Sequence, residues 1–462
     1  MAEAFARHRR RHEASPGLDE AARRAALGAL EALLLEHTTA LCTAVDRDFS
    51  GRAEPETRLL EIFPALEAIR HARRNLGRWM RPRRRSTSLW FRPGRSRVMM
   101  QPLGVVGIVV PWNYPIYLAV APLVAALAAG NRVMVKMSEA APQTGALFAR
   151  LVSERFDPAV VTVVNGGPDV AREFVCLPFD HLLFTGSTAV GRQVMHSAAA
   201  NLTPVTLELG GKSPAIVGRG FPVAEAAARI LFGKCLNAGQ TCIAPDYALV
   251  PRERMDDFAR AAGAAVARMY PRLRDNPDYT SIVNGHHRDR LAGCLAEACA
   301  RGAVATELNP AGEDFAGSPK MAPTLVVGAP DDVRLMREEI FGPLLPLVPY
   351  DTLEQAIGYV NARPRPLALY LFEHERAAID RVLSGTVSGG VTVNETLLHV
   401  SQESLPFGGV GASGMGAYHG IAGFDTFSKA KSVFFRSRFS GVKLLRPPYG
   451  RRFGSLLKLL LR

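Results

Sequence analysis

The chain has 462 residues, of which 48% are hydrophobic and 21% charged, as is ordinary for a soluble globular enzyme of two or three domains. Its six cysteines include no CxxC pair and no cysteine–histidine cluster with zinc spacing, which argues against a metal site and favours a reducing, cytoplasmic compartment. The net charge of +13 is regional: residues 70–97 carry eleven arginines, residues 436–462 carry eight Lys or Arg, and neither segment has an acid. No nucleic-acid recognition motif accompanies these segments, so nucleic-acid binding is not expected.

The N-terminal stretch MAEAFARHRRRHEASPG has no apolar run and is not a secretory signal. Glu3 and Glu13 weaken the alternative of a mitochondrial-type presequence. Residues 18–80 predict helices, because apolar and charged residues recur there at helical spacing with few Pro and Gly. Residues 86–100 predict a hairpin, since residues alternate in character around a Pro-Gly turn.

Residues 99–131 contain no charge, so their length alone would allow a membrane span. The segment PWNYP in the middle argues against a span, because it places two prolines and an asparagine there. GVVGIVV instead predicts a strand buried on both faces, and IYLAVAPLVAALAAG predicts a buried helix that ends at Gly130 and Asn131. NRVMVK is the next strand, and strand–helix–strand in this order predicts a parallel, doubly wound sheet.

The α/β pattern continues to the end of the chain. Further strands are predicted at AVVTVVNG, HLLFTG, TPVTLELGG and SPAIVG, and those of a second α/β region at TLVVG, PLLPLVPY, ALYLF and SGGVTVNE. The last residues, RRFGSLLKLLLR, place four apolar side chains on one helical face among basic residues: Phe453, Leu456, Leu457 and Leu460. This face predicts either contact with an anionic membrane surface, being too short to span a bilayer, or packing on the protein itself.

Four polar residues lie at the ends of apolar runs, where strand ends and loops of an open α/β sheet build a site: Asn113, Glu208, Cys242 and Glu339. Asn113 is either a turn asparagine bonded to its own backbone or an amide aimed at an oxyanion. Glu208, inside VTLELGGKSP, is either half of an ion pair with Lys212 or a general base whose pKa is raised by burial.

Cys242 stands in NAGQTCIAPDY, beside small and polar residues rather than aliphatic ones. Free cysteines are usually buried and inert, which is the expectation for the others: Cys42, Cys176, Cys235, Cys294 and Cys299. Gly239 leaves room for a backbone or a substrate to approach closely. FTGSTAVG, residues 184–191, ends a strand and opens a helix; without the GxGxxG spacing it indicates only a helix N-terminus that could meet a pyrophosphate.

Seven segments, in order and spacing from about residue 97 to residue 433, resemble the aldehyde dehydrogenase superfamily: PWNYP, KMSE, FTGSTAVG, LELGGKSP, GQTC, EEIFGP and LPFGGVGASGMG. The chain is most similar to the shorter, class-3-like branch, and GGVTVNETLLHV and YHGIAGFDTFSKAK resemble coniferyl aldehyde dehydrogenases. The resemblance implies NAD(P)-dependent oxidation of an aldehyde to the carboxylic acid. The aldehyde would be aromatic, such as coniferyl aldehyde, or medium- to long-chain aliphatic.

By position, the resemblance assigns three catalytic roles: Cys242 as the nucleophile, Glu208 as the general base that activates water, and Asn113 as the amide that stabilises the oxyanion. It implies a thiohemiacetal and then a thioester on the cysteine. The implied cofactor contacts are Trp112, Lys136, Glu139, Gly186, Ser187, Gly191, Leu209, Glu339 and Phe341. Members that pass the acyl group to coenzyme A generally lack the glutamate, so that alternative is disfavoured. The chain keeps Asn113, Glu208, Cys242 and Glu339 together, which argues against the alternative of an inactive, membrane-associated scaffold of the same fold.

One position departs from the family pattern, which commonly has a proline where this chain has Met137. Glu139, two residues later, disfavours a 2′-phosphate by charge repulsion. NAD is therefore the expected cofactor, with NADP as a second one that class-3-like members accept.

The family fold implies an α/β protein with a doubly wound, dinucleotide-binding domain at residues 1–85 and 103–207 and a second α/β, catalytic domain at 208–415. A small β element at 86–102 and 425–438 would bridge the domains, followed by a basic amphipathic tail at 439–462. A hairpin with an unpaired edge needs a partner, and the branch forms dimers, so a homodimer is expected. His399 lies either near the pocket mouth or in a structural role.

Overall fold

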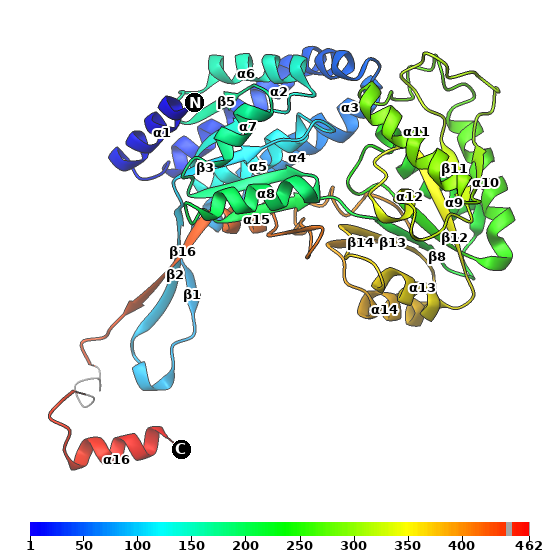
Figure 1. Cartoon of the computed structure of the whole chain (residues 1–462). Helices are drawn as coiled ribbons and strands as arrows, with labels where there is room; N and C mark the ends of the chain where they lie inside the picture. Colours follow the sequence, from blue (N-terminus) through cyan, green and yellow to red (C-terminus); the bar gives the residue numbers. More distant parts are fainter. Residues whose placement is uncertain (440–445, 462) are drawn as a thin grey trace.

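Three β-sheets organise the chain in the computed structural model, which describes residues 1–439 and 446–461 (Figure 1). The first sheet has six strands, in the spatial order β15 (Gly414–Met415), β7 (Val205–Leu209), β6 (His181–Gly186), β3 (Val105–Val109), β4 (Arg132–Lys136) and β5 (Val161–Val164). All neighbours pair in parallel except β15, which runs antiparallel to β7. The predicted parallel α/β sheet is confirmed.

Helices cover both faces of the first sheet (Figure 1). They are α1 (Ala2–Ala14), α2 (Glu20–Phe49), α3 (Glu54–Thr57), α4 (Phe63–Trp79), α5 (Tyr117–Ala129), α6 (Pro142–Arg155), α7 (Pro168–Val175), α8 (Thr188–Ala199) and α15 (Gly420–Thr426), with a π-helical turn at Arg58–Ile62 between α3 and α4. Every residue of α5 is buried, and the helix ends at Gly130 in the left-handed region. The uncharged segment is therefore a core helix and not a membrane span.

Helix α2 is also long and apolar enough to cross a membrane by length and composition. Its apolar side chains recur on one face, and that face is buried against α4, α5 and α6. A core helix of a globular protein has this pattern, so α2 is explained by its packing alone.

Helix α1 was not among the predicted helices. Phe5 is buried and packs edge-on against Phe179 at 5.3 Å between ring centroids. Arg9 pairs with Asp180 at 2.9 Å, and the ring of His8 hydrogen-bonds to Thr162 at 2.9 Å. The N-terminal stretch is thus part of the first sheet's outer layer.

The second sheet has seven strands, in the spatial order β10 (Val304–Glu307), β11 (Thr324–Val327), β12 (Leu344–Tyr350), β9 (Tyr247–Pro251), β8 (Pro214–Val217), β13 (Ala368–Phe372) and β14 (Gly390–Val393). Only β10 is antiparallel to its neighbour. The accompanying helices are α9 (Val223–Cys235), α10 (Met255–Met269), α11 (Gly285–Ala300), α12 (Arg334–Arg337), α13 (Leu353–Asn361) and α14 (Arg376–Gly385), with short 3-10 turns at Leu236–Gly239 and Arg252–Arg254.

The third sheet forms an arm that projects from the body (Figure 1). Its strands are β1 (Arg83–Arg85), β2 (Arg95–Pro102) and β16 (Ser428–Phe435), with a 3-10 turn at Leu89–Phe91 between β1 and β2. Strand β16 pairs with β2 along its full length, from Ser428 opposite Pro102 to Phe435 opposite Arg95. Helix α16 (Arg451–Leu460) lies beyond the end of the arm. Residues 440–445 and 462 of the predicted tail lie outside the described residues.

The expected boundary between residues 207 and 208 falls inside a strand. Glu208 belongs to β7 of the first sheet, and β15 from residues 414–415 pairs beside it. The chain thus returns to the first sheet after completing the second. The expected catalytic domain, 208–415, therefore includes at each end a few residues that belong to the first sheet. The point where the chain leaves one sheet for the other lies in an apolar run and has no signal in the sequence.

Candidate active site

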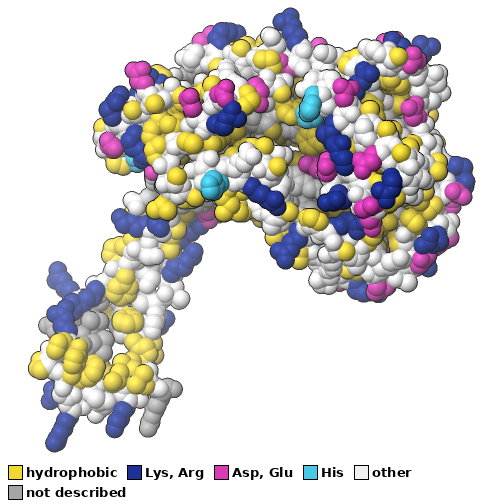
Figure 2. Space-filling model, viewed as in Figure 1, with side chains coloured by type: hydrophobic (Ala, Val, Ile, Leu, Met, Phe, Trp, Pro, Cys, Tyr) yellow, Lys and Arg dark blue, Asp and Glu magenta, His cyan; other side chains and the backbone are white. Residues whose placement is uncertain are grey.

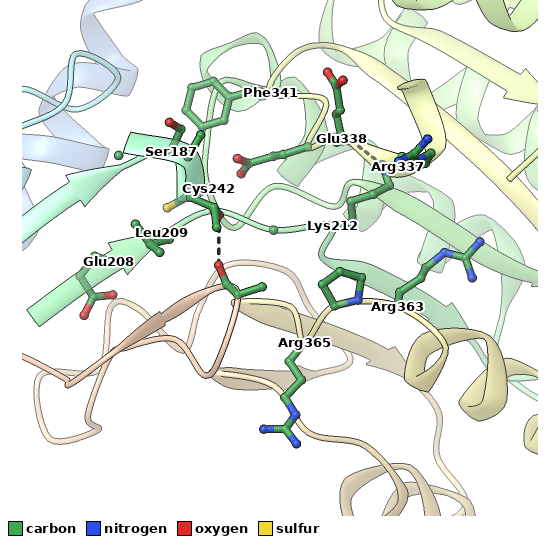
Figure 3. A pocket seen from close by; sticks show the side chains of 18 of the residues that line it. Ser187, Glu208, Leu209, Lys212, Cys242, Arg337, Glu338, Phe341, Arg363 and Arg365 are labelled. Carbon is green, nitrogen blue, oxygen red and sulfur yellow. Dashed lines mark hydrogen bonds between the residues drawn. The ribbon is translucent and has the colours of Figure 1, made fainter. Parts of the chain in front are cut away.

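A cavity of about 1150 Å³ lies between the two α/β parts of the molecule. The space-filling view shows the molecule hollowed there, with charged side chains around the opening (Figure 2). Nine of the twelve predicted site residues line it: Trp112, Asn113, Gly186, Ser187, Glu208, Leu209, Cys242, Glu339 and Phe341. They come from the loop after β3, from β6 and the start of α8, from β7, and from two loops of the second α/β part. Figure 3 labels Ser187, Glu208, Leu209, Cys242 and Phe341 among them. The fold thus brings together residues that are up to 229 positions apart in the chain.

Glu208 lies in the interior of a paired strand, opposite Thr185 of β6 on one side and Gly414 of β15 on the other. Its neighbours Leu207 and Leu209 pack in a buried apolar cluster, so the alternation of a strand turns Glu208 to the opposite face. Only 3% of Glu208 is exposed, and neither carboxyl oxygen has a hydrogen-bond partner among the described residues. This burial raises the pKa of Glu208 well above its usual value.

The alternative ion pair between Glu208 and Lys212 is wrong. The Lys212 ammonium bonds the Asp246 carboxylate and the backbone carbonyls of Leu335 and Glu338. Glu208 is therefore an uncompensated buried carboxyl on the cavity wall, which is the environment expected of a proton acceptor.

Cys242 follows α9 and a short strained turn. Asn237, Ala238 and Gly239 all have left-handed backbones, with φ of 52°, 51° and 75°. A Cβ on Gly239 would lie 2.3 Å from the carbonyl oxygen of Gly342, so this glycine makes room for a neighbouring backbone rather than for a substrate. Two consecutive non-glycine residues in this region store strain, which is common where a loop presents a functional group.

The Cys242 thiol has a raised pKa, first because of burial and then because of the nearby carboxyls of Glu339 and Glu208. At neutral pH the sulfur therefore carries its proton, and attack on a carbonyl requires a base that removes it. Burial also raises the pKa of Glu208, so that carboxyl is a stronger base towards water once it is ionised.

Asn113 is buried beside the cysteine loop. Its side-chain amide nitrogen donates to the backbone carbonyl of Gln240 at 3.2 Å. Its backbone carbonyl accepts from Arg52 Nη1 at 3.0 Å and from Asn237 Nδ2 at 3.1 Å. The Asn113 side chain bonds the cysteine loop and not its own backbone, so the turn-asparagine interpretation is not needed. An amide nitrogen has two hydrogens, so the second stays available to an oxyanion.

The remaining cavity wall fits a dinucleotide. The first turn of α8 faces the cavity through Ser187, Thr188 and Ala189, and Arg192 lies one turn further on. Free N–H groups and the helix dipole at such an end favour a pyrophosphate. Glu339 has one buried carboxyl oxygen without a hydrogen-bond partner in the described part of the chain, and this oxygen is free to accept from a ribose hydroxyl. Burial and the nearby Asp246 raise the pKa of Glu339 to about 8.

The Glu339 loop is fixed by contacts that the sequence did not suggest. The carboxylate of Asp246 accepts from the backbone N–H of Ile340 at 2.9 Å, and Arg290 donates to the carbonyl of Ile340 at 2.6 Å. Phe341, with φ of 50°, packs against Trp112 in a T-shaped arrangement with 5.3 Å between ring centroids. Both polar partners are distant in sequence from residue 340, so only the fold reveals them.

Lys136, Glu139 and Gly191 do not line the cavity. Lys136 ends β4, is buried, and lies 3.7 Å from the Glu139 carboxylate; burial lowers the pKa of Lys136. A Cβ on Gly191 would lie 2.6 Å from the Leu209 side chain, so this glycine lets α8 pack closely on β7. The departure at Met137 has a structural consequence, because its backbone N–H donates to Val164 at 3.0 Å, a bond that proline cannot make.

Two other expectations have outcomes in the structure. His399 is bonded through Nδ1 to Thr392 at 2.8 Å, stacks on Phe407, and is not a cavity residue; burial lowers its pKa to about 4, as expected for a structural histidine. Cys42, Cys235 and Cys294 are buried as expected, but Cys176 and Cys299 are exposed, so for these two the expectation was wrong. Both lie near the ends of surface helices, where an apolar residue need not face the core.

The chain is similar to known proteins over nearly its whole length. The family described as "Aldehyde dehydrogenase family" matches residues 2–433. A "Probable coniferyl aldehyde dehydrogenase" of Pseudomonas aeruginosa is 52% identical, over 98% of this chain and 94% of that protein. A "Coniferyl aldehyde dehydrogenase" of a Pseudomonas species is 48% identical, over 93% of this chain and 90% of that protein.

Two solved structures agree with these relatives. The substrate-bound state of Staphylococcus aureus AldH superposes with a TM-score of 0.93 at 37% identity and covers 99% of each chain. A Mycobacterium tuberculosis aldehyde dehydrogenase complexed with NAD+ superposes with a TM-score of 0.80 at 29% identity, over 89% of this chain and 84% of that one. The chain belongs to the aldehyde dehydrogenase family.

Proposed function

We propose that the protein oxidises an aromatic aldehyde of the coniferyl type to its carboxylic acid, with water as the final acyl acceptor. Membership of the family gives the NAD(P)-dependent oxidation of an aldehyde. The observation that carries the hydrolytic outcome is the buried, unpaired carboxyl of Glu208 on the wall of the cavity that holds Cys242.

In the proposed reaction each residue has one task. The Cys242 sulfur forms a bond to the aldehyde carbon while its proton passes to solvent, and Asn113 donates a hydrogen bond to the oxygen that becomes negative. A bound nicotinamide would supply the acceptor for the hydride that leaves the former aldehyde carbon, and this loss would leave a thioester on Cys242. Glu208 then removes a proton from water, the water oxygen bonds to the acyl carbon, and the sulfur leaves as a thiolate.

The acyl acceptor can be tested directly. Because Glu208 is placed to activate water, adding coenzyme A should leave the steady-state rate unchanged and yield no acyl-coenzyme A. The measurement is reduced-cofactor absorbance with and without the thiol, together with chromatography of the product. A rate that rises with coenzyme A, with a thioester as product, would favour the acyl-transferring alternative.

The names of the relatives support the substrate class, since the proteins at 48–52% identity are described as coniferyl or probable coniferyl aldehyde dehydrogenases. A panel of coniferyl aldehyde, benzaldehyde and linear aldehydes of six to twelve carbons should give the highest kcat/KM with coniferyl aldehyde. Higher kcat/KM for every linear aldehyde would instead place the protein with aliphatic substrates.

NAD is proposed as the preferred cofactor because Glu139, in the loop between β4 and α6 and 3.7 Å from Lys136, places a negative charge that repels a 2′-phosphate. Replacing the carboxylate by an amide removes its repulsion of a 2′-phosphate. Glu139→Gln should therefore raise kcat/KM for NADP by about tenfold, equivalent to about 1.4 kcal/mol, and change that for NAD much less. Steady-state rates over a range of each cofactor give the ratio, and equal changes for both cofactors would contradict this role.

We also propose a homodimer that forms through the projecting arm. Both outer edges of the arm's sheet are unpaired among the described residues. The arm also exposes apolar side chains that a monomer would leave in water: Leu89, Trp90, Phe91, Phe434 and Phe435. Light scattering should give twice the mass of one chain. The double substitution Phe434→Asp/Phe435→Asp should give the mass of one chain if the arm forms the interface, whereas an unchanged dimer would place the interface elsewhere.

The compartment proposed is the cytoplasm, with peripheral membrane contact through α16. The residues of the arm and tail, 78–102 and 428–461, include no acid. In α16, the half-buried apolar side chains Phe453, Leu456 and Leu460 lie among the basic residues Arg451, Arg452 and Lys458. Figure 2 shows basic and hydrophobic side chains gathered on this part of the molecule. Such a helix suits an anionic lipid surface.

Co-sedimentation with vesicles tests the membrane contact. The whole chain should pellet with phosphatidylglycerol vesicles, stay in solution with phosphatidylcholine vesicles, and be released by 0.5 M salt. A chain ending at Arg446 should stay in solution with both and keep its aldehyde dehydrogenase activity. Equal binding of the shortened chain would assign the contact to another surface.

A further inference from the structure

Arg52 lies at the centre of a buried polar cluster behind the candidate active site. Its side chain is fully buried, and its guanidinium lies 5.0 Å from the ring centre of Phe49 and 4.9 Å from that of Tyr114. Nη1 donates to the backbone carbonyl of Asn113 at 3.0 Å. An arginine is costly to bury, so its placement one hydrogen bond from the proposed oxyanion amide calls for a physical account.

Two glutamates accompany Arg52, and each holds a different part of the site. Glu56 lies 3.9 Å from the guanidinium and accepts from the backbone N–H of Asn237 at 2.9 Å and from Thr280 at 2.8 Å. Glu61 lies 3.7 Å from the guanidinium and accepts from the two backbone N–H groups at the start of α5, Ile116 and Tyr117. Burial raises the pKa of both carboxyls, and Arg52 opposes that shift.

The cluster therefore joins the two segments that carry the reacting groups. Asn237 begins the strained turn before Cys242, and its side-chain amide donates to the carbonyls of both Asn113 and Gln240. The carbonyl of Asn113 thus receives two donors, one from Arg52 and one from Asn237. The backbone on either side is braced further by a bond of 2.6 Å between the hydroxyls of Tyr114 and Thr241.

We propose that Arg52, held by Glu56, is a positioning residue that sets the Asn113 amide against the Cys242 sulfur. This inference rests on the proposed oxyanion role of Asn113. Arg52 does not line the cavity, so it acts through the backbone of Asn113 and through the turn that begins at Asn237. Displacing an amide by a fraction of an ångström weakens the hydrogen bond to an oxyanion while leaving cofactor binding unaffected.

The test compares Arg52→Met with a matched control, Arg23→Met. Arg23 is also buried and donates to backbone carbonyls, those of Leu18 at 2.7 Å and Ala128 at 2.9 Å, but none of these residues lines the cavity. Both variants should lower the melting temperature. Arg52→Met should lower kcat by about 30-fold with an unchanged KM for NAD, whereas Arg23→Met should keep the wild-type kcat.

Further variants separate positioning from folding. In Arg52→Met the Glu56 carboxyl loses its charged partner. The double variant Arg52→Met/Glu56→Gln replaces that carboxyl by an amide, so it should recover thermal stability relative to Arg52→Met but should not recover kcat. If Arg52→Met fails to fold, Arg52→Lys keeps the charge without the fork of donors and should lower kcat by about tenfold. In an Asn113→Ala background, Arg52→Met should cost no more than about twofold in kcat, because its effect passes through the residue already removed.

Each outcome has one meaning. A wild-type kcat in Arg52→Met, recovery of kcat together with stability in the double variant, or a full additive loss in the Asn113→Ala background would overturn the inference. Full activity of Asn113→Ala itself would instead overturn the proposed role of Asn113.

Discussion

Cys242→Ala should abolish aldehyde oxidation, with kcat reduced by more than about 10⁴-fold, because no other cysteine lies on the cavity wall among the described residues to form the thioester. Alanine is smaller than cysteine and should not disturb the loop, so binding of the cofactor should persist. The measurement is steady-state formation of reduced cofactor with coniferyl aldehyde, together with cofactor titration by fluorescence.

The matched control is Cys235→Ala, seven positions earlier at the end of α9. That sulfur is fully buried in the core and is not a cavity residue. The substitution should lower the melting temperature by removing buried volume, yet leave kcat near the wild-type value. Activity retained by Cys242→Ala, or lost equally in both variants, would contradict the assignment of the nucleophile.

Glu208→Gln should separate the two halves of the reaction. A glutamine cannot take the proton from water, so turnover should fall by about 10³-fold. The first turnover needs no water, and a burst of reduced cofactor equal to the number of active sites should remain. Rapid mixing with absorbance detection shows the burst and the slow phase that follows it. A lost burst with a normal slow phase would contradict the role given to this residue.

The pH dependence follows from the raised pKa of the same carboxyl. A general base works only when it is ionised. The hydrolysis rate of the wild type should therefore be low at acidic pH and rise as the pH passes a pKa that lies above the usual range of a glutamate. In Glu208→Gln this rise should disappear. Burial favours the protonated form, so the wild-type fold loses stability as pH rises through the raised pKa, and Glu208→Gln should be relatively more stable than wild type at high pH.

Most of the framework could be predicted from the sequence because buried parallel strands have a strong local signature. The runs that became β3, β4, β6, β7 and β8 are short and mostly apolar, and all but β6 are rich in β-branched residues. Glu208 was conspicuous within such a run because a carboxylate there is rare. The local signal at Cys242 was weak, since it consisted only of small and polar neighbours, and the resemblance to a family motif was needed to assign it as the nucleophile.

The features that could not be predicted from the sequence depend on contacts between residues that are distant in the chain. Arg52 stands in an exposed-looking stretch, GRAEPET, and becomes a buried charge only because Asn113 and Tyr114, distant in sequence, contact its guanidinium. Helix α1 had a weak signal: Phe5 and His8 recur at helical spacing, but the arginines between and after them hid it. Local patterns report burial along one element, and they do not report which elements meet.

The central claim is that the acyl group is carried by Cys242 and released by water that Glu208 activates. Intact-protein mass spectrometry of Glu208→Gln, mixed with coniferyl aldehyde and NAD and quenched in acid, tests it most directly. The account predicts a mass increase of one acyl group, mapped by peptide digestion to Cys242 and cleared on incubation with hydroxylamine. An unmodified protein after a full burst of reduced cofactor, or an adduct on another cysteine, would contradict it.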